Sequence, residues 1–281
     1  MPDTKTKTYA IIGNPVEHSM SPAIHNAAFQ KEKINAVYLA YKTQDVEGAV
    51  RGMRSLGISG FSVTIPHKIE VMKYLDEIDP TAEKIGAVNT IVNNDGKLFG
   101  TNTDGKGAFR AIKEAGVKLD NGKCVILGSG GAARAIAFTI AAESKINEIA
   151  VLGVNEKEYK SLAKEITKKT NVNVIPAHIE SIDDHIQTAK ILINCSPIGM
   201  HPNVDDSPVN KKSLFKKLCV FDIVYNPIKT KLLKLAKAKA CKIIYGTEMF
   251  LNQAVLQFEL WTGKKAPIKT MRKILMSKLN G

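Results

Sequence analysis

The chain has 281 residues, 44% of them hydrophobic and 24% charged, so it can form one large globular domain or two ordinary ones. Its formal net charge of +13 lies entirely in residues 211–281, which carry 16 Lys/Arg against three acidic residues. Of the 40 basic residues 35 are Lys, whereas specific phosphate and base recognition favours Arg. We therefore expect no nucleic-acid partner. The alternative, a protein that binds nucleic acid through the basic residues of 211–281, is kept open.

Secretion and membrane insertion are not expected. The start of the chain, residues 1–8, is polar, and no apolar run reaches the roughly 18 residues that a membrane span needs. The four cysteines lack CxxC spacing, which favours free thiols in a reducing cytoplasm. The six histidines form no metal-ligand pattern, so we expect no metal site.

Short apolar runs alternate with amphipathic stretches along the chain. Strands are predicted at 9–12, 37–41, 60–63, 88–92, 125–127, 148–152, 173–175, 191–194, 220–224 and 242–245. Helices are predicted at 21–31, 46–56, 131–142, 157–169 and 229–239, and helical periodicity dominates after residue 248. This alternation predicts an α/β protein with parallel sheets, and the loop at 100–105 is predicted to join two such units. Periodicity does not decide which unit the last helices pack on.

A polar loop follows the first predicted strand and contains Ser19 and Ser21. Pro22 suits the first helical position and Ser21 the N-cap before it. Two hydroxyls beside a free helix N-terminus can bind a carboxylate, since the positive end of the helix dipole favours an anion. Capping alone would also explain both serines.

Polar residues also stand beside the later strands of the N-terminal half. A strand is predicted to end at Thr64 and a helix to start near Pro66, which places Lys68 in the first helical turn. The helix dipole disfavours a cation there, so Lys68 is either simply exposed or positioned for chemistry. Asn89 lies near a strand start. Asp104 lies in the 100–105 loop, where it could be a helix N-cap, a functional residue or both.

A glycine motif typical of dinucleotide binding follows the strand at 123–127. The motif G-x-G-x-x-A is matched by Gly128, Gly130 and Ala133. The first glycine allows a tight turn, the second lets the backbone approach the pyrophosphate, and the small third residue lets helix and strand pack closely. The helix behind the motif presents its N-terminal N–H groups to phosphates. The candidate cofactor-binding residues of this turn are Gly128, Ser129, Gly130, Gly131 and Ala132.

The next strand ends without the usual marker of cofactor choice. A carboxylate there would bind the ribose hydroxyls of NAD, and an Arg would accept the 2′-phosphate of NADP. Residues 152–157 read LGVNEK, so Val154 and Asn155 stand at this point. Asn155 could bond a ribose and Lys157 or Lys160 could reach a phosphate, although both lysines could equally be solvated.

Eight ordered motifs make the chain resemble the shikimate dehydrogenase family from Gly13 to Gly263. They are GNPVEHSMSPAIHN (13–26), SVTIPHK (62–68), GAVNT (86–90), GTNTDGKG (100–107), GSGGAARA (128–135), NCSPIGM (194–200), DIVYNPIKT (222–230) and GTEMFLNQAVLQFELWTG (246–263). The resemblance implies reversible, nicotinamide-dependent reduction of 3-dehydroshikimate to shikimate in chorismate and aromatic amino-acid biosynthesis. It implies residues 1–103, completed by helices at 246–281, as the substrate domain and 104–245 as a Rossmann-like dinucleotide domain.

The resemblance also implies roles for individual residues. Lys68 and Asp104 would be the catalytic pair, and Ser19 and Ser21 would hold the substrate carboxylate. The remaining substrate contacts, besides the catalytic pair, would come from Thr64, Asn89, Tyr225 and Gln253. To the cofactor-binding candidates we add Val154, Asn155, Lys157, Ile223 and Gly246.

Two departures from the family pattern leave alternatives open. The family commonly has Asn-Arg-Thr after the second strand of the cofactor domain, where this chain has Gly153, Val154 and Asn155, so NAD is possible although NADP is expected. Ser62 stands where many members have Asn. The alternatives are a quinate/shikimate dehydrogenase using NAD and a non-catalytic domain that senses sugar acids. A monomer and a homodimer are equally compatible with the sequence.

Overall fold

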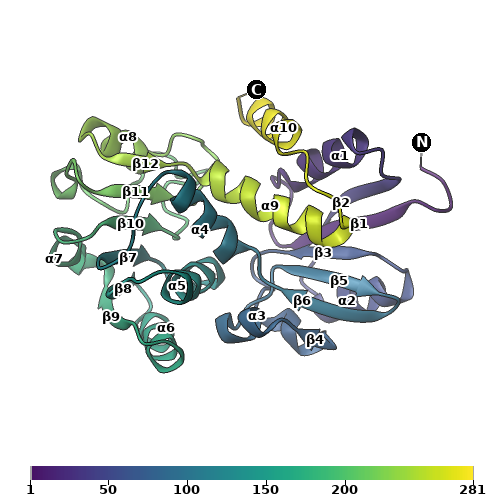
Figure 1. Ribbon diagram of the computed structural model, residues 1–281, viewed down its shortest axis with the longest axis horizontal. Helices are drawn as coiled ribbons and strands as arrows, with labels where there is room; N and C mark the ends of the chain where they lie inside the picture. The colour runs from purple at the N-terminus through teal and green to yellow at the C-terminus, as the bar shows by residue number, and fades with distance from the viewer. Residues whose placement is uncertain (1, 281) are drawn as a thin grey trace. The chain divides into compact units, whose positions relative to one another are not determined.

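The computed structural model describes residues 2–280 and divides into two compact units. Unit 1 comprises the chain up to Thr103 and from Gln253 onward, and unit 2 comprises Asp104–Asn252. Each unit is a sheet combined with helices (Figure 1), so the expected α/β class with two sheets is confirmed. No helix among residues 2–280 is long and apolar enough to span a membrane.

Unit 1 has a mixed six-stranded sheet in the order β2-β1-β3-β5-β6-β4. Three of its five pairings are parallel (β1 with β2, β1 with β3, and β4 with β6) and two are antiparallel. Its elements are β1 (Lys7–Gly13), α1 (Ser21–Lys31), β2 (Ala36–Lys42), α2 (Val46–Ser55), β3 (Gly60–Val63), the 3₁₀ helix η1 (Glu70–Tyr74), β4 (Glu77–Ile78), α3 (Pro80–Ile85), β5 (Thr90–Asn94), β6 (Lys97–Thr101), part of α9 (Gly246–Thr262), and α10 (Ile268–Asn280).

The hairpin between β5 and β6 was not predicted from periodicity. Asp95 and Gly96 form its turn with φ angles of 52° and 94°, a conformation that Asp-Gly sequences favour. Asn93 Oδ1 accepts a hydrogen bond from Gly96 N at 2.7 Å and closes the turn. The Asp-Gly pair was the sequence signal from which this hairpin could have been predicted. Because of the hairpin, β5 and β6 run antiparallel.

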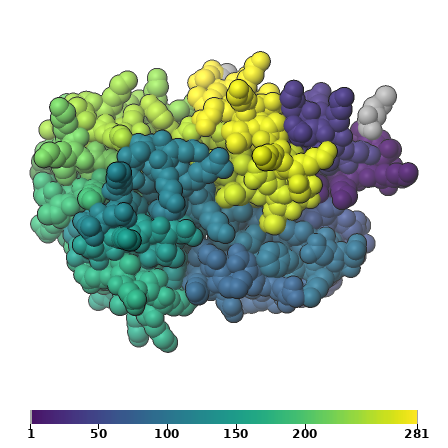
Figure 2. All heavy atoms as spheres, viewed as in Figure 1, coloured from purple at the N-terminus to yellow at the C-terminus, as the bar shows by residue number. Residues whose placement is uncertain are grey.

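The C-terminal helices pack on unit 1. Trp261 Nε1 of α9 donates to the carbonyl of Ile91 in β5 at 3.0 Å. Helix α10 lies beside α1, where the two are seen in yellow and purple (Figure 2). The last helices therefore return to the sheet of the N-terminal residues, a point that periodicity left open.

Unit 2 is a six-stranded, all-parallel sheet in the order β12-β11-β10-β7-β8-β9. Read from β9, this is the 3-2-1-4-5-6 strand order of the Rossmann fold, with its topological switch point between β7 and β10. Its elements are α4 (Asp104–Glu114), β7 (Lys123–Leu127), α5 (Gly131–Glu143), β8 (Glu148–Gly153), α6 (Glu156–Lys169), β9 (Asn173–His178), the 3₁₀ helix η2 (Ile179–Ser181), α7 (Ile182–Ile186), β10 (Ile191–Asn194), the 3₁₀ helix η3 (Lys211–Ser213), β11 (Cys219–Asp222), α8 (Lys231–Ala238) and β12 (Lys242–Ile244).

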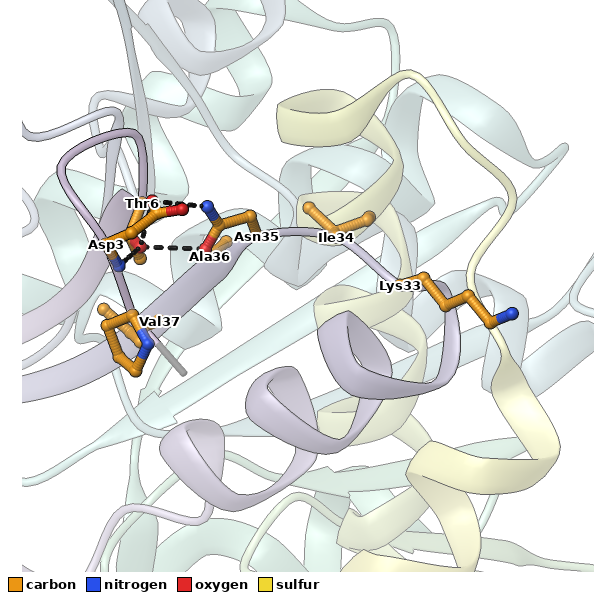
Figure 3. A pocket seen from close by; sticks show the side chains of 8 residues that line it. Asp3, Thr6, Lys33, Ile34, Asn35, Ala36 and Val37 are labelled. Atoms are coloured by element: carbon orange, nitrogen blue, oxygen red, sulfur yellow. Dashed lines mark hydrogen bonds between the residues drawn. The ribbon is translucent and has the colours of Figure 1, made fainter.

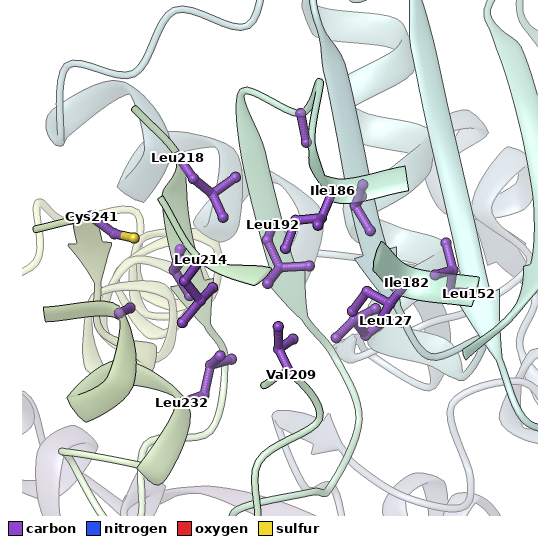
Figure 4. Packing of buried hydrophobic residues seen from close by; sticks show 14 of the residues in the cluster. Leu127, Leu152, Ile182, Ile186, Leu192, Val209, Leu214, Leu218, Leu232 and Cys241 are labelled. Carbon is purple, nitrogen blue, oxygen red and sulfur yellow. The ribbon is translucent and has the colours of Figure 1, made fainter. Parts of the chain in front are cut away.

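A continuous apolar core supports this second sheet. Leu127, Leu152 and Leu192, from three neighbouring strands, are fully buried in one cluster that also contains Ile186 of α7 and Leu232 of α8 (Figure 4). Burying each such side chain stabilises the fold by roughly 1.5–3 kcal/mol. The carboxyl ends of β7, β8, β10 and β11 are thereby held in fixed positions, which is what a binding site at these ends requires.

The start of α9 belongs to unit 2. The ring of Phe250 packs on that of Tyr225 with centroids 4.6 Å apart, and Asn252 Nδ2 donates to Glu114 Oε2 at 3.1 Å. Unit 2 accordingly extends to Asn252, seven residues beyond the expected 245.

Candidate active site

The loop after β1 carries Ser19 and Ser21 to the N-terminus of α1. The N-cap residue is Met20 and not the expected Ser21, which is the first helical residue and is 3% exposed. Ser19 Oγ accepts the backbone N–H of Ser21 at 3.3 Å and so takes over part of the capping. Because the first turn of α1 has no acidic residue, its positive dipole end remains available to an anion.

Thr64 follows β3 and lies against the end of β1. A Cβ on Gly13 would stand 2.2 Å from Thr64 Cγ2, so only glycine allows this approach. Asn14 N donates to Ile65 O at 2.9 Å, and Thr64 N donates to Ile12 O at 3.0 Å. These contacts join the serine loop and the Thr64–Lys68 segment at one edge of the sheet, since β1 and β3 are parallel neighbours.

Lys68 lies in a turn and not in a helix as expected, and the first helical element after it, η1, begins at Glu70. The argument from the helix dipole therefore does not apply to it. Its carbonyl accepts the N–H of Val88 at 2.8 Å, which fixes the Lys68 backbone beside the GAVNT segment. His67 is 2% exposed and its Nε2 bonds the carbonyl of Thr43 at 2.8 Å, an arrangement suited to structure and not to proton transfer with a ligand.

Asn89 connects this segment to the start of α4. Its Oδ1 accepts the N–H of Thr103 at 2.8 Å, and its Nδ2 donates to Thr103 Oγ1 at 3.0 Å. Thr103 is peptide-bonded to Asp104, the first residue of α4, which is 5% exposed. Lys68, Asn89 and Asp104 are thus linked through short, hydrogen-bonded stretches of backbone.

A buried polar chain behind Asn89 was missed by sequence analysis. Tyr38 OH donates to Ser62 Oγ at 2.6 Å, and Ser62 Oγ donates to Gln257 Oε1 at 3.0 Å. Gln257 Nε2 donates to Thr90 Oγ1 at 2.9 Å, and Thr90 Oγ1 donates to Asn89 Oδ1 at 2.7 Å. The serine at position 62 therefore has a defined partner on each side, and burial raises the pKa of Tyr38 well above its usual range.

The two remaining candidate substrate residues lie in different surroundings. Gln253 is on α9, one turn before Gln257, and is 8% exposed. Tyr225 follows β11 in unit 2, packs on Phe250, and burial raises its pKa to about 12. Its phenol therefore stays protonated at neutral pH and acts as a hydrogen-bonding group only.

The glycine turn has the geometry that a dinucleotide requires. Gly128 has φ 104°, and a Cβ there would lie 3.2 Å from the backbone of Cys195, which follows β10 at the switch point. Gly130, the N-cap of α5, is exposed and has nothing within 4 Å of its Cβ position. Ala133 is fully buried between helix and sheet. Ser129, Gly131 and Ala132 are partly exposed, so the turn can accept a pyrophosphate at the N-terminus of α5.

The end of β8 adjoins this turn and carries no arginine. Val154 is 74% exposed, Asn155 caps α6 by accepting the N–H of Glu158, and Lys157 is exposed in the first turn. Lys160, considered for a phosphate, is ion-paired with Glu156.

Ile223 and Gly246 meet beside the end of β11. A Cβ on Gly246 would lie 2.5 Å from the carbonyl oxygens of both Ile223 and Val224, so this position requires glycine. Asp222, at the end of β11, is fully buried, and burial raises its pKa to about 6. It accepts hydrogen bonds from Thr230 Oγ1 at 2.6 Å and Asn194 Nδ2 at 3.0 Å, a network that sequence analysis also missed.

One pocket of unit 1 is lined by none of these residues. It is formed by the start of the chain and the segment before β2, where Asn35 bonds Thr6 and Asp3 at 2.8 Å each (Figure 3). These polar groups are engaged with one another, so we assign the pocket no ligand. Residues 2–280 contain no cluster of three or more His, Cys, Asp or Glu residues able to hold a metal ion.

A Rossmann unit with an open glycine turn, together with an α/β unit carrying a lysine and a set of buried polar side chains, defines a two-domain, nicotinamide-dependent oxidoreductase. Residues 11–91 match the shikimate dehydrogenase substrate binding domain, and residues 246–276 match the shikimate 5′-dehydrogenase C-terminal domain. The chain belongs to the shikimate dehydrogenase family, as its motifs predicted.

Curated and structural relatives cover nearly the whole chain. Shikimate dehydrogenase (NADP(+)) of Methanocaldococcus jannaschii is 44% identical over 99% of both chains. A solved shikimate dehydrogenase in complex with NADP+ is 43% identical, with a TM-score of 0.94 over 99% of this chain and 98% of that one. A Listeria monocytogenes shikimate 5-dehydrogenase in complex with shikimate and NAD is 36% identical, with a TM-score of 0.90 over 98% of each chain.

Proposed function

We propose that this protein catalyses the reversible, NADP-dependent reduction of 3-dehydroshikimate to shikimate in the cytoplasm, as a step of chorismate and aromatic amino-acid biosynthesis. The observation that carries the proposal is the linkage from Lys68 through Val88 and Asn89 to Thr103 and Asp104. In this proposal unit 1 binds the substrate and unit 2 binds the dinucleotide.

Lys68 and Asp104 are the proposed catalytic pair. Bound NADPH supplies the hydride that reduces the ketone. The Lys68 ammonium donates a proton to the oxygen that becomes a hydroxyl and stabilises the negative charge developing there. Asp104 accepts hydrogen bonds from Lys68 and from that hydroxyl, which orients both, and in the reverse direction Lys68 takes the proton back.

The other polar residues of the site bind the substrate. Ser19 and Ser21, beside the unopposed N-terminus of α1, receive the substrate carboxylate. Thr64, Asn89 and Gln253 hold ring hydroxyls, and Tyr225 supplies a neutral phenol to the same ring. The glycine turn, Val154, Asn155, Lys157, Ile223 and Gly246 are the proposed cofactor contacts.

Nicotinamide absorbance kinetics test the proposal with shikimate and quinate, each combined with NADP and NAD. We expect turnover with shikimate, and less with quinate, because family members specialised for quinate often carry Thr at the position of Ser21. Absence of turnover in all four combinations contradicts the proposal. Binding of shikimate without turnover would instead favour a sugar-acid sensor. Light scattering after size exclusion distinguishes the two expected assemblies, a monomer and a homodimer.

A further inference from the structure

Glu158, the third residue of α6, is bonded to the glycine turn as well as to its own helix. Ser129 Oγ donates to Glu158 Oε2 at 2.9 Å, and Asn155 Nδ2 donates to Glu158 Oε1 at 2.9 Å. Gly153 completes the group, since its Cβ position lies 3.7 Å from Ser129 Oγ. An exposed carboxylate thus stands between the turn after β7 and the end of β8, the two segments that surround the adenosine ribose in this fold.

The segment that carries this carboxylate offers few cations. Residues 153–160 contain no arginine, and their cations are Lys157 and Lys160, the second of which is engaged by Glu156. Unit 2 contains two arginines, and both are paired elsewhere. Arg110 bonds Glu114 at 2.9 Å, and Arg134 bonds Glu165 at 2.6 Å. The guanidinium that normally accommodates a 2′-phosphate is therefore not supplied from this end of the sheet.

The residues fit the dinucleotide but do not favour its 2′-phosphate. A phosphate monoester carries nearly two negative charges at neutral pH, and a neighbouring carboxylate repels it. A free ribose hydroxyl instead donates a charge-assisted hydrogen bond to the same carboxylate. We propose that Glu158 is a specificity-determining residue that receives the adenosine ribose hydroxyl of NAD and weakens binding of the 2′-phosphate, so that this chain accepts NAD as well as NADP. The inference rests on the proposed dehydrogenase function.

A purely structural role for Glu158 makes a different prediction. Asn155 caps α6, and a Glu at the third helical position commonly supports such a cap. If Glu158 acted only there, its replacement would lower the melting temperature and change the affinities for both dinucleotides equally. The ratio of the two affinities is therefore the decisive quantity.

Isothermal titration calorimetry of NAD and NADP with the full-length protein gives this ratio without catalysis. In Glu158→Gln, which keeps an acceptor for Ser129 but removes the charge, we expect the Kd for NAD divided by that for NADP to rise about tenfold. Glu158→Lys raises it further, because an ammonium attracts the phosphate. Glu143→Gln is the control, since it removes an exposed carboxylate at the end of α5, outside residues 153–160. We expect this control to leave the ratio unchanged.

Three outcomes overturn the inference. The first is a ratio of the Kd for NAD to the Kd for NADP that stays, in both Glu158 variants, within twofold of its value in the unmodified protein. This result overturns the inference whether or not the melting temperature falls. An equal change in Glu143→Gln also overturns it, because the effect would then be one of net charge. If the unmodified protein binds neither dinucleotide, the proposed function fails together with this inference.

Discussion

Asn89 and Thr103 are joined by reciprocal hydrogen bonds inside unit 1. The side-chain oxygen of Asn89 accepts the backbone N–H of Thr103 at 2.8 Å, while its amide nitrogen donates to the Thr103 hydroxyl at 3.0 Å. Both residues are at most 5% exposed. The side-chain amide of Asn89 thus fixes Thr103, the residue before Asp104. Asn89 itself is held by hydrogen bonds that its carbonyl accepts from Gln257 and its side-chain oxygen accepts from Thr90.

Replacing Asn89 by Ala should destabilise the protein and impair turnover together. The N–H of Thr103 and the hydroxyl of Thr90 lose their shared acceptor, and each unsatisfied buried group costs about 1–3 kcal/mol. Urea denaturation gives the free energy of unfolding, and steady-state kinetics on the folded fraction give kcat. Asn147→Ala, at an exposed site of unit 2, is the control. Unchanged stability in Asn89→Ala would contradict the assigned role.

Lys68→Ala should lower kcat by about 10²–10⁴-fold, the usual contribution of a positioned acid or base, with little change in KM. Lys73→Ala, which removes an exposed lysine from η1, should leave kcat unchanged. Steady-state kinetics with shikimate and NADP measure both. Near-normal turnover of Lys68→Ala would refute its role in proton transfer.

Two glycines should respond oppositely to alanine. At Gly130 a Cβ meets nothing within 4 Å, so Gly130→Ala should change the free energy of unfolding by less than about 1 kcal/mol but raise the Kd for NADP at least about tenfold, since the methyl group hinders the pyrophosphate. At Gly246 a Cβ meets two carbonyl oxygens at 2.5 Å, so Gly246→Ala should cost about 1–3 kcal/mol. Denaturation and calorimetry separate the two effects, and equal loss of stability in both variants would contradict this contrast.

Asp222 should make the free energy of unfolding depend on pH. Burial raises its pKa from 3.8 to about 6, so the folded protein binds its proton more tightly than the unfolded chain does. Its contribution to stability is therefore full below pH 3.8 and is lost as the pH rises through about 6. In urea denaturation, the unfolding free energy of the unmodified protein minus that of Asp222→Asn should fall by roughly 3 kcal/mol between pH 4 and 7. A constant difference would mean that Asp222 keeps its ordinary pKa.

Local patterns predicted the elements whose signals lie within a few residues. The strand Gly60–Val63, the helix Ser21–Lys31 and the glycine turn at Gly128 are present as expected, because periodicity and turn chemistry act over short stretches. The family assignment was correct for a similar reason, since ordered motifs are a property of the sequence. Lys68 was placed in a helix because Pro66 suits a helix start, but the turn persists until η1 begins at Glu70.

The sequence by itself determined the α/β class, the dinucleotide motif and the family of this protein. Only the tertiary structure decided which residues support the site. Ser62 and Gln257 are 195 positions apart and bond at 3.0 Å, and Ser129 and Glu158 are 29 positions apart and bond at 2.9 Å. Such pairs depend on strand order and on the return of α9 to unit 1, which arise from burial of apolar faces over the whole unit. No local pattern encodes them, because a side chain's partner is selected by the fold that brings the two together.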